Sequence, residues 1–311
     1  MFAQFKTLPQ LFDYFKDEQT CMAYWIEVRW EGNITCPRCG HGNPYTTSRG
    51  YRCTNIECQK KFSALVGSIF ENTKIPLRTW FAAIYMCTGH KKGVSSLHLS
   101  RELGIHAKSA WFLLHRIREA FGDELLEPLG GEGVVVETDE TYIGGKVKNM
   151  SNAKRKEIKD KLRGVNDNKT TIMGYIERSN RLHYQVLRKE ESIHLQVTTI
   201  VNPLSVLMTD SATTYTNIGK EFAHHGIVDH SKKEYVRDVY HTNTIEGSFS
   251  HLDRMVIGIY HYVSPKHMQA YCNEQAYRYN TRKISNVDRF EDTVRKFGGK
   301  RLTYNQLVAD A

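Results

Sequence analysis

Three acidic residues stand in contexts suited to holding divalent metal ions: Asp139, Asp210 and Glu246. Asp139 follows the apolar run Val134–Val136, and Asp210 follows the apolar run Val206–Met208. Glu246 opens a stretch with helical spacing, so two strand ends and one helix are expected to supply three carboxylates. Carboxylate oxygens are the ligands that Mg²⁺ and Mn²⁺ prefer, and two such ions about 3.5–4 Å apart can clamp the attacking and leaving oxygens of a phosphodiester. The pattern predicts metal-assisted phosphodiester chemistry.

A second set of metal-ligand residues is a cluster of cysteines near the N-terminus. Four of the seven cysteines form two pairs around a loop of thirteen residues: Cys36 and Cys39, then Cys53 and Cys58. Because the N-terminus lacks the apolar core of a signal peptide, this clustering favours a metal over a disulfide framework. The spacing is typical of tetrahedral structural zinc sites, which leave no position for water. We expect one structural Zn²⁺, with His41 as the substitute ligand if Cys58 is out of reach.

Basic residues surround these cysteines and give the small module a second expected role. They are Arg38, Arg49, Arg52, Lys60 and Lys61. Such a surface suits contact with DNA phosphates. The alternative is that the charges only keep an exposed module soluble.

Length and composition limit the classes of protein that the sequence allows. A chain of 311 residues with 40% hydrophobic content is long enough for two or three domains. The formal net charge of +9 and the pI near 9.1 favour a polyanionic partner. No stretch approaches the roughly 20 apolar residues of a membrane span, so we expect no membrane partner and a cytoplasmic, nucleoid-associated location.

Helical spacing dominates the front half outside the cysteine module. Residues 1–30 suggest two short amphipathic helices, and residues from Leu77 to about Phe121 suggest three more, with a turn at Gly104–His106. A helix, a short turn with glycine and a second helix are typical of a helix-turn-helix DNA-binding unit. In the third helix, Lys108, Ser109 and Phe112 are expected to lie nearest the base edges, and Arg116 and Arg118 are expected to contact the DNA backbone. The alternative is that this helix only builds a core.

The rear half changes to strands that are followed by a helix. A linker with Pro128 and three glycines precedes strand-like runs at 133–138, 171–177, 183–187 and 205–209, and helical spacing returns after Asn243. This order fits an α/β layer architecture. Between the first two strands, Lys146–Lys169 carries nine Lys or Arg against three Asp or Glu. That stretch is expected either to grip DNA or to form a solvated loop.

At this point the chain resembles the zinc-ribbon DDE transposases of bacterial insertion sequences, the family related to eukaryotic Merlin elements. The resemblance extends over about residues 10–290, and its motifs occur together and in order. The motifs are Cys36–Gly40, Lys61–Ser63, Gly67–Phe70, Ala110–Trp111, His115–Arg118, Glu137–Lys146, Thr209–Asp210, Asn243–Gly247 and Tyr277–Asn280.

The resemblance implies a ribonuclease H-like catalytic domain in which Asp139, Asp210 and Glu246 bind two Mg²⁺ or Mn²⁺ ions. Such a domain would nick the ends of the element and join the freed 3′-hydroxyl to target DNA. Asn243 is a second candidate for the third ligand. The family usually carries a basic residue seven positions after the last acid; here that position is Asp253, followed by Arg254.

The expected organisation combines these inferences with the resemblance. The domains are an N-terminal helical segment 1–30, a zinc ribbon 31–65, a helix-turn-helix-like domain 66–128, a ribonuclease H-like domain 129–295 and a tail 296–311. The expected partner is double-stranded DNA, namely the terminal inverted repeats and the target, with Lys146 and Arg254 as further contacts. Because two element ends must be held together, we expect a homodimer or larger oligomer. A DNA-binding regulator without catalysis and a stand-alone metal nuclease are the alternatives.

Overall fold

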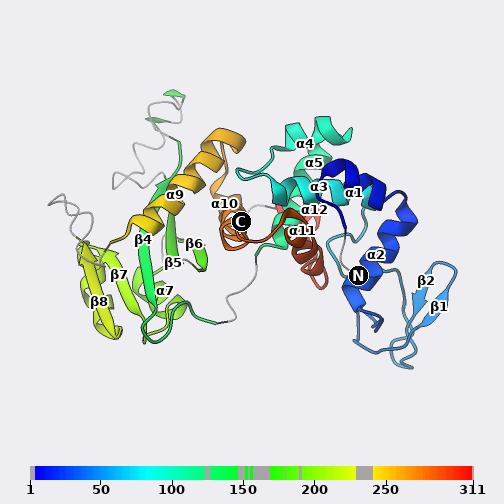
Figure 1. The fold of residues 1–311 in the computed structure, drawn as a ribbon, viewed down its shortest axis with the longest axis horizontal. Coiled ribbons are helices and arrows are strands. Elements are labelled where there is room, and N and C mark those ends of the chain that lie inside the picture. Colours follow the sequence, from blue (N-terminus) through cyan, green and yellow to red (C-terminus); the bar gives the residue numbers. More distant parts are fainter. Residues whose placement is uncertain are drawn as a thin grey trace. The chain divides into compact units, whose positions relative to one another are not determined.

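The structure of the chain is a computed structural model that describes residues 4–122, 127–145, 151–152, 155–156, 169–178, 180–188, 191–228 and 241–309. It divides into two compact units, coloured along the sequence in Figure 1. Unit 1 comprises Met1–Gly122 together with Thr281–Ala311, and unit 2 comprises Asp123–Asn280. Among the helices within these described ranges, none has the length and apolar character needed to cross a membrane.

Unit 1 begins with the two short helices that the sequence predicts, α1 (Leu8–Tyr14) and α2 (Glu18–Trp30). The side chains of Thr7 and Asp17 accept backbone N–H groups at the starts of these helices, as polar residues at N-caps do. Three short antiparallel strands follow in the order β1-β2-β3. Their bounds are β1 (Tyr45–Thr47), β2 (Gly50–Arg52) and β3 (Lys61–Phe62).

Three longer helices complete the front part of unit 1, where the sequence predicts them. They are α3 (Leu77–Gly89), α4 (Ser96–Leu103) and α5 (Ala107–Glu119). The Ser95 hydroxyl accepts the N–H of His98 at 3.1 Å and starts α4, and Gly104, with φ of 63°, ends it. Glycine adopts this left-handed conformation without a steric cost, so the chain can turn directly into α5.

Residues Thr281–Ala311 return to unit 1 and supply part of its core. They form α11 (Asn286–Arg295) and α12 (Tyr304–Val308). Phe290 and Phe297 are fully buried, and the Phe290 ring centroid lies 5.3 Å from that of Phe5 and 5.5 Å from that of Phe81. The expected catalytic domain extends to residue 295, whereas the structure groups α11 with unit 1, because these aromatic contacts join it to the segment before α1 and to α3.

Unit 2 contains a five-stranded sheet in the order β6-β5-β4-β7-β8. The strands are β4 (Val135–Ile143), β5 (Thr170–Glu177), β6 (Leu182–Val186), β7 (Val206–Asp210) and β8 (His224–Val228). β4, β5 and β6 pair antiparallel, while β7 and β8 are added in parallel. The chain is thus mixed α/β, as the sequence predicts, and β8 is a strand that the sequence analysis did not identify.

Helices cover both faces of this sheet. One face packs on α9 (Asn243–Met255) and α10 (Met268–Asn280), with Ile172, Ile176 and Tyr184 in the shared core. The other face packs on α7 (Ile193–Ile200) and α8 (Thr213–Ile218). Short turns follow α8 and α9: η2 (Gly219–Glu221), the π-helical η4 (Val256–Tyr260) and η5 (Pro265–His267). Unit 2 is therefore a three-layer arrangement in which each strand presents alternate residues to different helices.

Candidate metal centres and nucleic-acid surfaces

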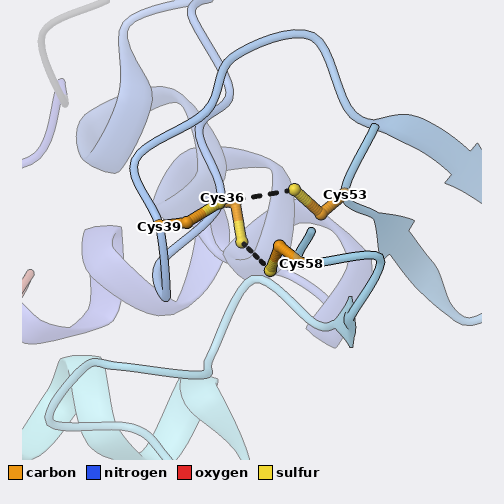
Figure 2. A group of neighbouring side chains, drawn as sticks. All are labelled: Cys36, Cys39, Cys53 and Cys58. Atoms are coloured by element: carbon orange, nitrogen blue, oxygen red, sulfur yellow. Dashed lines mark hydrogen bonds between the residues drawn. The ribbon is translucent and has the colours of Figure 1, made fainter. Parts of the chain in front are cut away.

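The four cysteines predicted to bind zinc come together at one end of the small sheet of unit 1 (Figure 2). Their sulfur atoms all lie within 4.8 Å of one another. Cys36 Sγ is 3.9 Å from Cys58 Sγ, and Cys39 Sγ is 3.5 Å from Cys53 Sγ. Cys58 is therefore within reach of the cluster, and the alternative ligand His41 is not needed to complete it.

The spacing of the sulfur atoms fits a tetrahedral zinc ion. Four sulfurs at about 2.3 Å from a central ion lie about 3.8 Å from one another, close to the two distances above. Burial raises the pKa of Cys36, but the backbone N–H groups of Arg38 and Cys39, with help from neighbouring thiols, outweigh it and lower the pKa to about 7. The turn therefore favours the thiolate that zinc requires.

The basic residues around this site all point to solvent. Each of the five is exposed: Arg38, Arg49, Arg52, Lys60 and Lys61. Arg52 Nη2 donates to Gln59 Oε1 at 3.1 Å on this surface. The cysteine module thus presents positive charge that a polyanion can reach.

Strand alternation places Asp139 and Asp210 on the same face of the large sheet. On β4, Glu137 and Ile143 face α9 and α10, so Asp139, which shares their parity, faces the same way. On β7, Leu207 faces α7 and α8, so Asp210 faces the opposite side. Glu137 pairs with Met208 in the parallel ladder, and the same register brings Asp139 level with Asp210.

One expected detail differs, because Asp139 does not stand at a strand end. β4 continues to Ile143, and Asp139 pairs with Gly174 of β5. The ladder between β4 and β7, however, ends at Glu137. Asp139 therefore sits just beyond the point where these two strands part, and Asp210 is the last residue of β7, as expected.

Glu246 lies in the first turn of α9, the helix that covers this face. Ile245, Phe249 and Leu252 are buried against the sheet. Glu246 is half-buried beside them, and its Oε1 accepts a hydrogen bond from Thr242 Oγ1 at 3.0 Å. Asn243, the other candidate for the third ligand, is exposed at the first position of the helix.

The three carboxylates are close enough to affect one another electrostatically. Burial, with a smaller contribution from the charges of Glu140, Asp210 and Glu246, raises the pKa of Asp139 to about 7. The N–H of Glu140, which donates to Asp139 Oδ1 at 2.8 Å, opposes this rise. A site where acidic groups repel one another and resist ionisation is one that a cation stabilises.

The acidic residues are nevertheless less tightly grouped than the cysteines. Within the part of the chain that the structure describes, the four cysteines are the one set of three or more ligand residues whose ligand atoms gather within 4.8 Å. The chemistry of the acidic set still fits Mg²⁺ or Mn²⁺, because it offers only hard oxygen donors on one face of a sheet.

Two further residues of this region had no role in the sequence analysis. Glu140 lies on the opposite face of β4 from Asp139, and its Oε2 accepts the Tyr215 hydroxyl at 2.5 Å. Burial raises the pKa of Glu140, the Tyr215 hydrogen bond lowers it, and the charge of Asp210 raises it again. Strand alternation separates Glu140 from the face that carries Asp139, but its contact with α8 could not be predicted from spacing.

The candidate DNA contacts on α5 divide into two groups. Lys108 is exposed and Ser109 is half-buried near the start of the helix, where both were expected to face DNA. Arg116 and Arg118 are only 4% and 1% exposed. Arg116 Nη2 donates to the carbonyl oxygen of Glu71 at 2.8 Å. The structure therefore offers no surface from which either arginine could contact a phosphate, because both guanidinium groups lie in the interior of unit 1.

The remaining predicted contacts lie in unit 2. Lys146 falls outside the described residues. Arg254 is exposed near the end of α9, and its Nε donates to the Ser250 carbonyl at 2.9 Å. Asp253, at the position where the resemblance leads one to expect a basic residue, is also exposed. Burial of part of its carboxylate raises the pKa of Asp253.

Comparisons with known proteins agree with this division into a cysteine module and an acidic domain. Residues 16–61 match the transposase zinc-ribbon domain, and residues 128–280 match the ISXO2-like transposase domain. The second match ends at the last residue of unit 2. The chain is also 24% identical over 250 residues to an uncharacterized protein in transposable element ISH50 of Halobacterium salinarum, a match that covers 76% of this chain and 82% of that protein. The resemblance found in the sequence is thus confirmed, and the chain belongs with the zinc-ribbon DDE transposases of insertion sequences.

Proposed function

We propose that this transposase binds the terminal inverted repeats of its own insertion sequence and catalyses metal-dependent nicking and strand transfer at their 3′ ends. The observation that supports the proposal is the placement of three acidic residues. Asp139 of β4 and Asp210 of β7 lie on one face of the sheet, and Glu246 lies in the first turn of α9, the helix that covers that face.

The strand order supports a ribonuclease H-like assignment for unit 2. Three antiparallel strands, β6, β5 and β4, are followed by two parallel additions, β7 and β8. The first acid lies on the central strand, the second ends its parallel neighbour, and the third lies on a later helix. This arrangement is the one expected for that fold, and it gives the candidate ligands rigid backbone supports.

The reaction needs no covalent intermediate with the protein. In nicking, a water oxygen forms a bond to phosphorus while the bond to the 3′ oxygen breaks, and that oxygen takes up a proton. In strand transfer, the freed 3′-hydroxyl attacks a phosphorus of target DNA, displaces the target's 3′ oxygen and conserves the number of phosphodiester bonds. Two bound Mg²⁺ or Mn²⁺ ions would lower the pKa of the nucleophile and offset charge at phosphorus. Asp139, Asp210 and Glu246 are the residues proposed to hold them.

Unit 1 is proposed to recognise DNA. Its basic cysteine module is exposed, and α4, the Gly104 turn and α5 have the order of a helix-turn-helix. Lys108 and Ser109 remain the proposed readers of base edges, whereas the buried Arg116 and Arg118 are reassigned to the core. A homodimer or larger assembly that acts on cytoplasmic, nucleoid DNA follows from the need to hold two ends.

The experiment is incubation of the purified protein with labelled element-end DNA in Mg²⁺ or Mn²⁺, alongside Asp139→Ala and Glu246→Ala. We expect wild type to nick at the element end and both variants to lose nicking by at least about a thousandfold while still binding DNA. Nicking that persists in both variants would show that these residues are not the metal ligands. Wild-type protein that binds but never nicks would favour the regulator, the reading that Asp253 supports.

A further inference from the structure

Glu137 is a fully buried carboxylate near the start of β4, two residues before Asp139. A carboxylate removed from water is costly unless hydrogen bonds or charges compensate it. Its position in β4 is opposite Met208 of β7 and Ile176 of β5. The side chain therefore lies at the centre of the sheet, on the face that carries the acidic site.

The compensation comes from the start of α9, more than 100 residues further along the chain. Glu137 Oε2 accepts the backbone N–H groups of Thr244 at 2.9 Å and Ile245 at 3.0 Å. Glu137 Oε1 accepts the Thr244 hydroxyl at 2.9 Å and Arg178 Nε at 2.7 Å. His241 Nδ1 lies 3.3 Å from the same oxygen.

These contacts replace a local helix cap. The residue that precedes α9, Thr242, makes no side-chain cap, and its hydroxyl donates to Glu246 instead. The first N–H groups of a helix need acceptors, and the helix dipole favours a negative charge there. Glu137, on the sheet, supplies both the acceptor oxygens and the negative charge. The first turn of α9 is therefore fixed at the position of this carboxylate.

Two other features fix the same junction. Arg178 Nη2 donates to the carbonyl oxygen of His241 at 3.0 Å, which ties the segment before α9 to the end of β5. Gly174, which pairs with Asp139, has no side chain, and a Cβ built there would lie 2.6 Å from Ile245 Cδ1. The helix thus rests directly on the strand beside Asp139.

We infer that Glu137 is a positioning residue that sets the place of Glu246 relative to Asp139 and thereby the affinity of the site for divalent cations. Glu246 follows Ile245 directly, and Asp139 lies two positions from Glu137 on the same face of β4. One carboxylate therefore links the two backbone segments that carry the first and third acids. The inference rests on the proposed function, in that these acids bind the catalytic ions.

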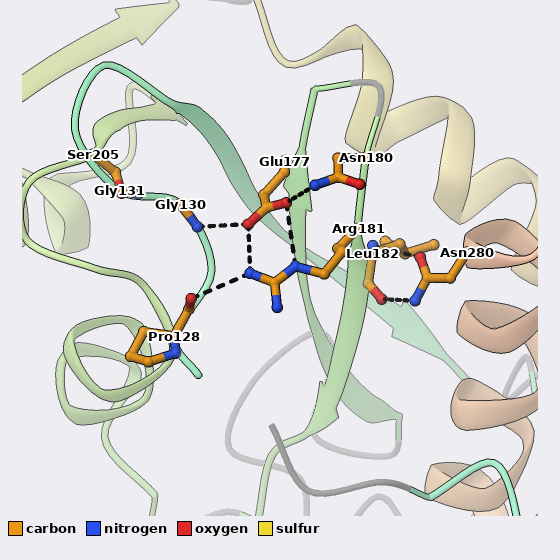
Figure 3. Close-up of polar contacts among 9 residues, drawn as sticks. All are labelled: Pro128, Gly130, Gly131, Glu177, Asn180, Arg181, Leu182, Ser205 and Asn280. Atoms are coloured by element: carbon orange, nitrogen blue, oxygen red, sulfur yellow. Dashed lines mark hydrogen bonds and ion pairs between the residues drawn. The ribbon is translucent and has the colours of Figure 1, made fainter. Parts of the chain in front are cut away.

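Glu177 provides a matched control for the cost of altering a buried glutamate. It is 3% exposed at the end of β5, the neighbouring strand. Its carboxylate accepts the Gly130 N–H at 2.7 Å, Asn180 Nδ2 at 2.7 Å and Arg181 Nη2 at 2.8 Å (Figure 3). These partners come from the segment before β4 and the turn after β5, so this glutamate stabilises the sheet without holding α9.

The test measures Mn²⁺ binding to the zinc-loaded full chain by electron paramagnetic resonance, and then the Mn²⁺ dependence of nicking. The proteins are wild type, Glu137→Gln, Glu177→Gln and Asp139→Asn. Glutamine keeps one acceptor oxygen but turns an N–H donor towards a helix end that already offers donors. We expect Glu137→Gln to weaken Mn²⁺ binding roughly tenfold or more, in the range seen for residues that orient ligands.

Several readouts separate this role from a loss of stability. Glu137→Gln is expected to lose amide-exchange protection at Thr244 and Ile245 and to recover nicking when Mn²⁺ is raised. Glu177→Gln is expected to lower the melting temperature yet keep the wild-type Mn²⁺ midpoint. An unchanged midpoint in Glu137→Gln, or an equal shift in Glu177→Gln, overturns the inference.

Failure of the proposed function gives a different result. Suppose that wild type binds Mn²⁺, that Asp139→Asn abolishes this binding, and that wild type does not nick DNA. This result contradicts the proposed function alone, and the Mn²⁺ binding midpoints of the variants still decide the role of Glu137. Wild type that binds no Mn²⁺ overturns both.

Discussion

The two candidate metal centres of this chain are built in opposite ways. The cysteine site uses four residues within a span of 23, and short turns bring their sulfurs within 4.8 Å of one another. The acidic site uses Asp139, Asp210 and Glu246, which are spread over more than 100 residues and supported by two strands and a helix. A structural site can be defined by local sequence, whereas the acidic site depends on how distant elements pack.

The electrostatics of the two sites can also be compared. The turn at Cys36 lowers the pKa of that thiol to about 7, whereas burial raises the pKa of Cys53 to about 12, so the cysteine site presents its ligands with unequal ease of ionisation. At Asp139, burial and neighbouring acids raise the pKa to about 7, which leaves the metal-free carboxylate resistant to ionisation. The cysteine site is expected to stabilise the fold when filled, and the acidic site is expected to reduce stability when empty.

The largest effect is expected from removal of the cysteine site with Cys36→Ser/Cys39→Ser. The three strands around it have only two or three residues each, so the ion must replace a hydrophobic core. Structural zinc contributes on the order of 10 kcal/mol to the folding of such modules. We expect zinc to fall from one ion per chain to none and amide protection in β1–β3 to disappear, while Mn²⁺ binding persists. Equal zinc content in the two proteins would contradict the assignment.

The next effect concerns the cost of the empty acidic site and its pH dependence. Because the folded pKa of Asp139 is raised above the unfolded value near 4, the folded state holds a proton that the unfolded state has lost. Wild-type stability without added divalent cation should therefore fall as pH rises from about 4 to 7 and then level off. Asp139→Asn should remove this loss, with a gain over wild type that is larger at pH 8 than at pH 5 by on the order of 2 kcal/mol.

Thermal melts of both proteins at the two pH values measure this difference. A gain that is the same at pH 5 and pH 8 would mean that Asp139 ionises normally in the fold. The two variants can be compared directly. Cys36→Ser/Cys39→Ser removes a site that stabilises the fold when it is filled, whereas Asp139→Asn removes a carboxylate that destabilises the fold when its site is empty.

A smaller effect is expected where α9 approaches the sheet. A Cβ at Gly174 would lie 2.6 Å from Ile245 Cδ1 and 2.8 Å from ring atoms of Phe249. Gly174→Ala should therefore cost about 1–3 kcal/mol and weaken Mn²⁺ binding, because the helix must move away from Asp139. Urea unfolding measures the first effect.

Gly247 is the matched control on the same helix. It is exposed, and no atom lies within 4 Å of a Cβ built there. Gly247→Ala should raise stability by about 0.5–1 kcal/mol, since alanine is the better helix former. Two substitutions of the same kind are thus expected to act with opposite sign, and a loss at both positions would refute the close approach at Gly174.

The smallest effect is expected in unit 1, at the end of α5. Lys300 Nζ donates to the carbonyl oxygens of Ala120 at 3.2 Å, Glu119 at 3.3 Å and Gly122 at 3.5 Å. A cation suits the negative end of a helix, so Lys300→Ala should cost about 0.3–1 kcal/mol in urea unfolding. Lys74→Ala, at an exposed loop position, should change stability by less than about 0.5 kcal/mol. Equal effects would show that the cap adds nothing.

Features set by neighbouring residues were predictable from the sequence. The pairs of cysteines, the Ser95 cap and the buried face of α9 at Ile245 and Phe249 depend on spacings of a few residues, and the structure has all three. Each of these rests on local geometry that one segment determines by itself. The common face of Asp139 and Asp210, by contrast, depends on how β4 pairs with β7.

Features that depend on distant partners were not predictable. Arg116 was expected to be a basic residue on the surface, yet it is buried. Its guanidinium donates a hydrogen bond to the Glu71 carbonyl and lies over the Trp80 ring. Glu137 shares the face of Asp139 by simple alternation, but no spacing reveals that it would cap a helix more than 100 residues away. The sequence did not predict β8, because His224–Val228 is short and begins with two histidines in place of apolar residues.

The return of Thr281–Ala311 to unit 1 has a consequence for the order of events during protein synthesis. Phe290 and Phe297 fill a core with Phe5, Phe81 and Phe70, so that core lacks essential side chains until Phe297 has been synthesised. The sheet of Asp123–Asn280, by contrast, has all its strands once Val228 has emerged from the ribosome. Nascent chains usually fold from the N-terminal domain onwards; here the core that contains Phe5 is completed only after every strand of the sheet in unit 2 has been synthesised.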